Sequence, residues 1–371
     1  MNARVVVVLA ILLVALGGGA LLIKQQDRAQ SPESGAVLGK PLLKDLKASE
    51  VAAIRIRDAK QEMNLVRGGD NSWTVVERDG FPADFTRVSE LVLKAIELKI
   101  GQSEPIGEKD RVRLQLIEPV AGKEALEGAG TLLEFKSADG KPLARLVIGK
   151  KYFKAEPAVP DRAIGDGRFV QLPGTDKTVY IVADPLVQAT TRSADWVLRK
   201  GIAADKIMSL EVRAADGAQW AIERSGDNAE WKLIGAGAGE KLEVTRANAA
   251  AYGLSSLDLA DVAPKSLKPE DAGLASPATI TAKTFDGLTY TLKVGKLEGE
   301  NHYVSVAIDG TPAPAAGDAA KDAAERAKAL AERLAREKAL VPYTLLIPVQ
   351  RLEDMLKPRA ELLEKKDEQK K

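Results

Sequence analysis

Ser72-Trp73-Thr74-Val75 recurs as Glu230-Trp231-Lys232-Leu233, 158 residues later, and this repetition decides how the chain is divided. Downstream, Leu114-Gln115-Leu116-Ile117-Glu118-Pro119 is matched at the same offset by Ala272-Gly273-Leu274-Ala275-Ser276-Pro277. Further out, Ile148-Gly149-Lys150 is matched by Val294-Gly295-Lys296. The offset is 158 residues up to the Pro119/Pro277 pair and 146 residues at the last pair, because the first copy carries extra residues near Val120–Thr131. A shared order of landmarks with a single change of offset indicates an internal duplication.

Each copy follows the same order of local patterns. Short segments alternate apolar and polar residues, as in 51–57, 63–67 and 73–77, which is typical of half-buried strands. A helix is expected from about Asp84, because apolar side chains from Val88 to Leu98 share one face. A second antiparallel group follows over 131–182, and a closing helical segment is expected from Asp184, with Pro185 in its first turn. The sequence therefore predicts an α+β fold with two tandem copies of an antiparallel strand-rich unit.

Composition excludes several function classes. The 371 residues include 54 Lys plus Arg against 53 Asp plus Glu, and a net charge of +1 argues against a nucleic-acid-binding surface. The absence of cysteine removes disulfides, thiolate nucleophiles and cysteine-based zinc sites. His302 is the single histidine, and no partner motif marks it as catalytic or metal-binding. We expect no cofactor, no metal site and no catalytic residues.

Val5 to Ile23 is an unbroken run of 19 apolar and small residues. As a helix it would span about 28 Å, close to the thickness of a bilayer's hydrocarbon core. The competing interpretation is a cleaved signal peptide, with Ala15-Leu16-Gly17 as a small-x-small cleavage site. The length of the run favours a single-pass anchor in a bacterial inner membrane, with the remainder of the chain in the periplasm.

These observations divide the chain as follows: an anchor at 1–24, a linker at 25–40, a first repeat at 41–200, a second repeat at 201–357 and a charged tail at 358–371. The second repeat carries an insertion at 313–340, rich in Ala, Arg, Lys and Glu. Its Ala and Leu residues from Ala320 to Leu334 step by three and four, a short heptad seam. The insertion is expected to be an amphipathic helix that packs on its own repeat or is solvated. Alternatively, 318–340 docks onto a partner. Because the seam is narrow, we expect the fold not to depend on it.

Aromatic and basic residues are the candidate contact residues. Trp73 and Trp231 are suited to an exposed platform for sugar, although their equivalent positions in both copies favour a packing role. Arg192, Trp196 and Arg199 fall at i, i+4 and i+7 of the expected closing helix. On a helix they would form a cation–π stack or join the two repeats, and the joint is the favoured interpretation.

The chain resembles the bacterial family of domain of unknown function 4340. The residues that carry the resemblance are the apolar span, the two tryptophans after a turn, Ala272–Pro277 before Thr279–Gly295, and Tyr180 to Arg199. The resemblance implies a single-span protein with one or more strand-rich units, and the insertion at 313–340 departs from it. Some relatives are encoded beside ABC-type transport and gliding-motility-like components, which implies an accessory role at the envelope and no reaction.

The leading hypothesis is a non-enzymatic, membrane-anchored extracytoplasmic accessory or scaffold protein of an envelope assembly, with a membrane-protein partner. The main alternative is a binding module that takes a glycan or lipid in a cleft between the repeats. A carboxylate-dependent hydrolase would require two facing acids in one pocket.

Overall fold

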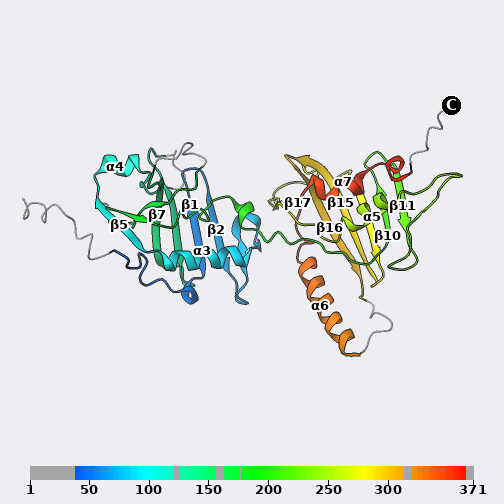
Figure 1. The fold of residues 1–371 in the computed structure, drawn as a ribbon, viewed down its shortest axis with the longest axis horizontal. Helices are drawn as coiled ribbons and strands as arrows, with labels where there is room; N and C mark the ends of the chain where they lie inside the picture. Colours follow the sequence, from blue (N-terminus) through cyan, green and yellow to red (C-terminus); the bar gives the residue numbers. More distant parts are fainter. Residues whose placement is uncertain (1–37, 121–125, 156–162, 176, 313–319, 365–371) are drawn as a thin grey trace, which may run out of the picture. The chain divides into compact units, whose positions relative to one another are not determined.

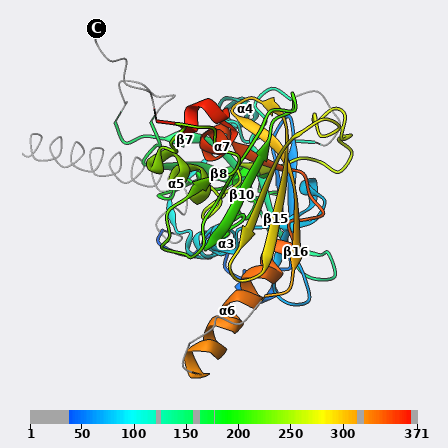
Figure 2. The ribbon, with the colours of Figure 1, turned by 90° about the vertical axis from the view of Figure 1, so that its right-hand side faces the viewer.

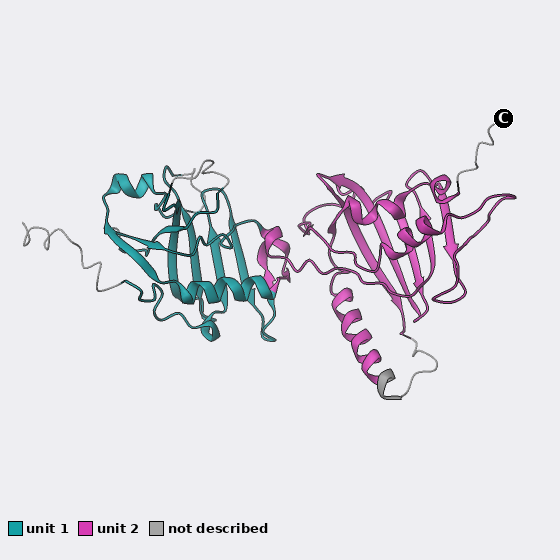
Figure 3. Ribbon diagram, in the orientation of Figure 1, with its two compact units in different colours: residues 1–73, 85–192 teal, residues 74–84, 193–371 magenta. Residues whose placement is uncertain are grey.

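The computed structural model describes residues 38–120, 126–155, 163–175, 177–312 and 320–364. The chain forms two compact units, one of residues 1–73 and 85–192 and one of residues 74–84 and 193–371 (Figure 3). Each unit contains an antiparallel sheet and few helices, which confirms the predicted α+β class. Arg78 and Phe81 attach 74–84 to the second unit, because Arg78 pairs with Asp261 and Phe81 packs edge-to-face on Tyr343.

The first sheet has nine strands in the order β4-β3-β2-β1-β6-β7-β8-β9-β5. Alternation along the strands sends one set of side chains into the core: Ile54 and Ile56 of β1 are almost fully buried, as are Met63 and Leu65 of β2. The strands are β1 (Ala53–Arg57), β2 (Glu62–Arg67), β3 (Trp73–Val75), β4 (Phe81–Pro82), β5 (Ile100–Pro105), β6 (Thr131–Lys136), β7 (Pro142–Tyr152), β8 (Gly167–Gln171) and β9 (Thr178–Val182).

The second sheet has eight strands in the order β12-β11-β10-β14-β15-β16-β17-β13. Apart from β4, this order corresponds strand for strand to that of the first sheet. The strands are β10 (Ile207–Arg213), β11 (Gln219–Glu223), β12 (Lys232–Leu233), β13 (Asp261–Val262), β14 (Ala278–Thr284), β15 (Leu288–Glu298), β16 (Asn301–Gly310) and β17 (Leu345–Pro348). No strand was predicted for β5 or β13, the matching edge strands of the two sheets.

One loop has the same hydrogen bonds in both units. In the first, Lys150 N donates to Leu114 O at 2.9 Å, and in the second Lys296 N donates to Ala272 O at 3.0 Å. Gly149 and Gly295 permit this approach, since a Cβ would lie 2.4 Å from Leu114 O or 2.2 Å from Ala272 O. The paired Gly-Lys sequences thus have a structural cause.

Two helices bury the side chains of their predicted apolar faces. Helix α3 (Phe85–Glu97) runs across the strands of the first unit and buries Val88, Leu91, Val92 and Ala95 (Figure 1). Its counterpart α5 (Val244–Tyr252) buries three alanines, and the Glu243 carboxylate accepts hydrogen bonds from its first free amides. The remaining short helical elements are α4 (Glu108–Arg113) and 3₁₀ turns at Ala48–Glu50, Val76–Arg78, Ser193–Asp195 and Arg359–Leu362.

The closing helix forms in the second unit alone, so its prediction for the first repeat is wrong. After β17, α7 (Val349–Leu356) follows Pro348. After β9, the chain instead makes a loop with the 3₁₀ turn Ser193–Asp195. The Asp184 carboxylate accepts the amide hydrogen of Leu186 at 2.7 Å, and Leu186 has a φ of 49°. A left-handed residue after an Asx turn cannot continue a right-handed helix.

The inserted helix α6 (Ala320–Lys338) projects from the second unit (Figures 1 and 2). Residues 324–329 are exposed, whereas Leu334, Glu337 and Leu340 are buried. Glu337 accepts hydrogen bonds from Ala203 N and Tyr290 Oη, both at 2.9 Å. The C-terminal part of the helix is therefore anchored in its own unit, which contradicts the expectation that the insertion buries little.

The proposed anchor Val5–Ile23, the linker up to 37 and residues 313–319 and 365–371 lie outside the described residues. Among the described helices, none is long and apolar enough to cross a membrane. Residues 359–363, which the sequence analysis assigns to the tail, belong to the second unit, where Leu362 is fully buried and its carbonyl accepts from Glu243 N.

Candidate functional site

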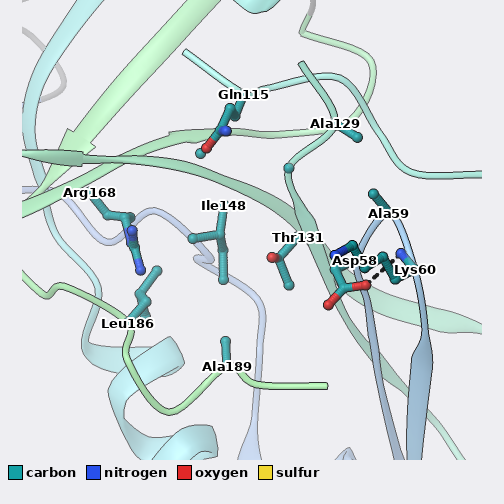
Figure 4. Close-up of a pocket in the computed structure, with 12 residues that line it drawn as sticks. Asp58, Ala59, Lys60, Gln115, Ala129, Thr131, Ile148, Arg168, Leu186 and Ala189 are labelled. Atoms are coloured by element: carbon teal, nitrogen blue, oxygen red, sulfur yellow. Dashed lines mark hydrogen bonds between the residues drawn. The ribbon is translucent and has the colours of Figure 1, made fainter. Parts of the chain in front are cut away.

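A pocket of about 390 Å³ lies in the first unit, at the end of β1, the beginning of β6 and β8, and the middle of β7. Charged side chains lie on opposite sides of it: Arg168 from β8 on one side, and Asp58 and Lys60 after β1 on the other (Figure 4). Thr131 and Ile148 lie between them (Figure 4). The loop after β9 supplies Leu186 and Ala189. All of its lining residues belong to the first unit.

Asp58 is held by three donors. Its Oδ1 accepts the amide hydrogens of Lys60 at 2.7 Å and Gln61 at 2.9 Å, and its Oδ2 accepts the hydroxyl of Thr191 at 2.6 Å. Gln61 in turn donates to Thr191 Oγ1. Burial alone would raise the pKa of Asp58, but these hydrogen bonds outweigh it and hold the pKa below its usual range. Asp58 is therefore a fixed, ionised acceptor at neutral pH.

Arg168 is half-buried, and its side chain donates a hydrogen bond to a backbone carbonyl. Its Nε donates to Pro185 O at 2.9 Å, which orients the guanidinium. Burial lowers the pKa of Arg168, with no opposing effect from an acidic side chain. Among the described residues, none forms an ion pair with its terminal nitrogens. A guanidinium presents these nitrogens as a fork that fits carboxylate or phosphate.

Gln115, Thr131 and Lys60 add further polar groups to the lining, and the backbone conformation of Gln115 is unusual. The φ of Gln115 is 58°, a left-handed value that costs a non-glycine residue free energy. Gly130 allows the loop to lie on β6, because a Cβ there would be 2.3 Å from Gln115 O. The first unit thus holds an amide side chain at the pocket in spite of local strain.

The polar lining is not repeated in the second unit. The residue after β1 is Asp58, but the residue after β10 is Ala214. Strand register equates Arg168, the partner of Lys151, with His302, the partner of Leu297, and each pair directly follows a register shift. Gln115 corresponds to Gly273, whose amide makes the same 3.1 Å hydrogen bond to the third residue back. The packing groups recur and the polar pocket groups do not, so the fold itself does not require them.

The candidate residues from the sequence lie elsewhere. Trp73, Trp196 and Trp231 are each no more than 6% exposed and belong to the cores of their units. The Trp231 ring stacks under the Arg224 guanidinium at 4.7 Å, and its Nε1 donates to Asn248. Arg192 and Arg199 are exposed. Because the chain forms no α-helix over 192–199, only the short 3₁₀ turn Ser193–Asp195, the i, i+4, i+7 spacing does not place these residues on one face.

Sequence reasoning did not identify Asp58, Gln115 or Arg168 as site residues. No local motif marks them, since they come from three separate segments. A signal was nevertheless present in the duplication: at each of these positions the second copy carries a residue of different chemistry. In the part of the chain that the structure describes, no group of three acidic or histidine side chains is arranged to hold a metal ion.

Comparison with known proteins identifies the family to which the chain belongs. Searches of curated proteins and of solved structures found no match. One family model, Domain of unknown function (DUF4340), matches residues 73–277, more than half of the chain. This range runs from the first duplicated tryptophan to Pro277, the end of the second matched loop. The chain belongs to the DUF4340 family.

Proposed function

We propose that this chain is a non-enzymatic, membrane-anchored accessory or scaffold protein of an envelope assembly. In this proposal, two tandem copies of one unit follow a transmembrane helix and lie in the periplasm. The observation that carries it is the 19-residue apolar run Val5–Ile23 before two folded, strand-rich units. The exposed part of α6, residues 324–329, supplies a surface suited to a membrane-protein partner.

Protease treatment of spheroplasts tests the topology. The full chain, detected by an antibody to the second unit, should be degraded in spheroplasts and protected in intact cells. It should also resist extraction by salt and carbonate. Protection in spheroplasts, or a mature chain that starts near Gly18, would overturn the anchored periplasmic arrangement.

Cross-linking in intact membranes, followed by mild detergent extraction, tests the accessory role. We expect a stable membrane partner with the full chain and a weaker association when 324–329 are replaced by Gly and Ser. Replacing the exposed Lys109 and Lys141 of the first unit with Gln is the control and should change nothing. Recovery of the chain alone would overturn the scaffold proposal.

A second candidate function, ligand binding, is favoured by the pocket between Asp58 and Arg168. It differs from the alternative drawn from the sequence, because its lining residues all belong to the first unit. Binding and scaffolding are compatible, since a ligand would add recognition to an anchored protein.

A further inference from the structure

The pocket of the first unit has the Arg168 guanidinium on one side and the Asp58 carboxylate on the other, with the exposed Lys60 beside Asp58. Arg168 comes from β8 and Asp58 from the end of β1, and the sheet order β1-β6-β7-β8 places three inter-strand steps between them. At about 4.8 Å per step, their backbones are about 14 Å apart. Both side chains line the pocket, Arg168 on one side and Asp58 on the other (Figure 4). The space left between the two charged groups suits a molecule only a few atoms long.

Arg168 and Asp58 each have hydrogen-bonding positions that no described residue occupies: donors on Arg168 and an acceptor on Asp58. The Arg168 fork has donors without an ion-pair partner among the described residues, so it selects an anionic group. The carboxylate of Asp58 is fixed by the turn and by Thr191, and an ionised carboxylate has about four lone-pair positions, of which three are used. It therefore selects a donor, best an ammonium group.

The rest of the lining favours a small polar ligand. Gln115 and Thr131 add an amide and a hydroxyl, and Ile148, Leu186 and Ala189 add apolar surface. None of the described residues that line the pocket is aromatic, so they give a sugar ring no stacking surface. We propose that the pocket binds a small zwitterion of the amino-acid or dipeptide kind, with its carboxylate on Arg168 and its ammonium group on Asp58.

This proposal deepens the second candidate function and does not depend on the scaffold role. The purified full chain in detergent is titrated at constant ionic strength with glycine, β-alanine, 4-aminobutyrate and glycylglycine. Propionate and propylammonium serve as single-charge probes. Binding is followed by calorimetry and by ligand-observed NMR. We expect one zwitterion of matching length to bind at least about tenfold more tightly than either single-charge probe.

Variants identify the two ends of the ligand. Arg168→Gln should weaken every carboxylate probe by about tenfold or more, and Arg168→Lys should restore part of the loss. Asp58→Asn should reduce the zwitterion to the affinity of propionate while propionate itself is unaffected. Arg113→Gln, which removes an exposed guanidinium of the same unit outside the pocket, is the matched control and should bind as the native chain does.

Two results would overturn the proposal: no preference for any zwitterion over propionate, or unchanged zwitterion binding by Arg168→Gln. Circular dichroism and thermal unfolding establish that each variant is folded. If Arg168→Gln does not fold, the binding affinity of Arg168→Lys tests the role of the guanidinium instead. Because binding is measured on the purified chain, its failure leaves the topology and cross-linking results of the scaffold proposal intact.

Discussion

At the scale of single residues, the first sheet is crossed by a row of alternating charges. Strand register places Glu134 between Arg55 and Arg145, and its side chain is 6% exposed. The carboxylate lies 2.8 Å from Arg55 and 3.2 Å from Arg145. The corresponding row in the second sheet runs from Glu211 through Thr281 to Thr291, so it carries one charge and no alternation of sign. The row of alternating charges is therefore specific to the first unit.

Removing the central carboxylate should be costly. Glu134→Gln leaves two partly buried guanidinium groups without their shared anion, and we expect a loss of about 3 kcal/mol in the free energy of unfolding. Urea denaturation of the full chain measures it. Glu118→Gln, which removes a more exposed partner of Arg145, should cost less than about 1 kcal/mol. Equal losses for the two variants would contradict the central role of Glu134.

Replacing Gln115 should stabilise the protein, in contrast to replacing Glu134. The left-handed backbone of Gln115 suits glycine, so Gln115→Gly should stabilise the first unit by about 0.5–1 kcal/mol in thermal unfolding. The same replacement at Gln219, an exposed position of β11, should destabilise the second unit by a similar amount, because glycine weakens a strand. If Gln115→Gly also destabilises, the side chain has a packing role.

At the scale of elements, α6 combines an exposed part and an anchored part. Glu337 is fully buried and accepts hydrogen bonds from Ala203 N and Tyr290 Oη. Glu337→Ala leaves both donors unsatisfied, so we expect a loss of about 2–4 kcal/mol in unfolding free energy. Glu332→Ala on the same helix, at a 68% exposed side chain, is the matched control and should be nearly neutral. If Glu337→Ala leaves the free energy of unfolding unchanged, α6 is a solvated arm that contributes nothing to the stability of the second unit.

The same contact predicts a response to alkaline pH. Burial first, and then the negative charge of Glu337, raises the pKa of Tyr290 above its usual value. A raised folded-state pKa stabilises the fold below the unfolded pKa of about 10, and this contribution is lost as pH rises above it. The native chain should therefore lose more unfolding free energy than Tyr290→Phe between about pH 9 and 11. Parallel pH curves would contradict this.

At the scale of the whole molecule, the two units are not two consecutive stretches of chain. Residues 74–84 precede α3 in sequence but group with the second unit. Arg78 forms two hydrogen bonds to the Asp261 carboxylate, at 2.8 and 2.7 Å, and Phe81 is fully buried against Tyr343. The second unit is therefore incomplete without a segment from the first repeat.

A fragment of residues 193–371 tests this dependence. Without 74–84 it leaves Asp261 unpaired and Tyr343 uncovered, so we expect it to unfold at lower urea than the same unit in the full chain, by about 3 kcal/mol or more. Tryptophan fluorescence follows the transition. A synthetic peptide of residues 74–84 should restore stability, and the same peptide with Arg78→Ala and Phe81→Ala should not. Equal stability of fragment and full chain would show that the segment contributes nothing.

Much of the fold followed from short-range patterns in the sequence. Strand alternation and the apolar faces of α3 and α5 are local properties, since each depends on residues a few positions apart. The duplication identified the paired loops at Leu114 and Ala272. The closing helix of the first repeat was mispredicted because one side-chain hydrogen bond from Asp184 and one left-handed residue, Leu186, override the helical pattern.

The sequence by itself determined the α+β class, the two strand-rich units and the apolar run near the N-terminus, because periodicity and repetition are written along the chain. Tertiary structure alone decided the pocket, because strand order places Asp58, Gln115 and Arg168 around one opening although they are far apart in sequence. It also decided that the tryptophans and Glu337 are buried, since burial depends on which distant segments pack against a side chain. The local pattern determines which face of a helix or strand is apolar, and long-range packing determines which residues that face contacts.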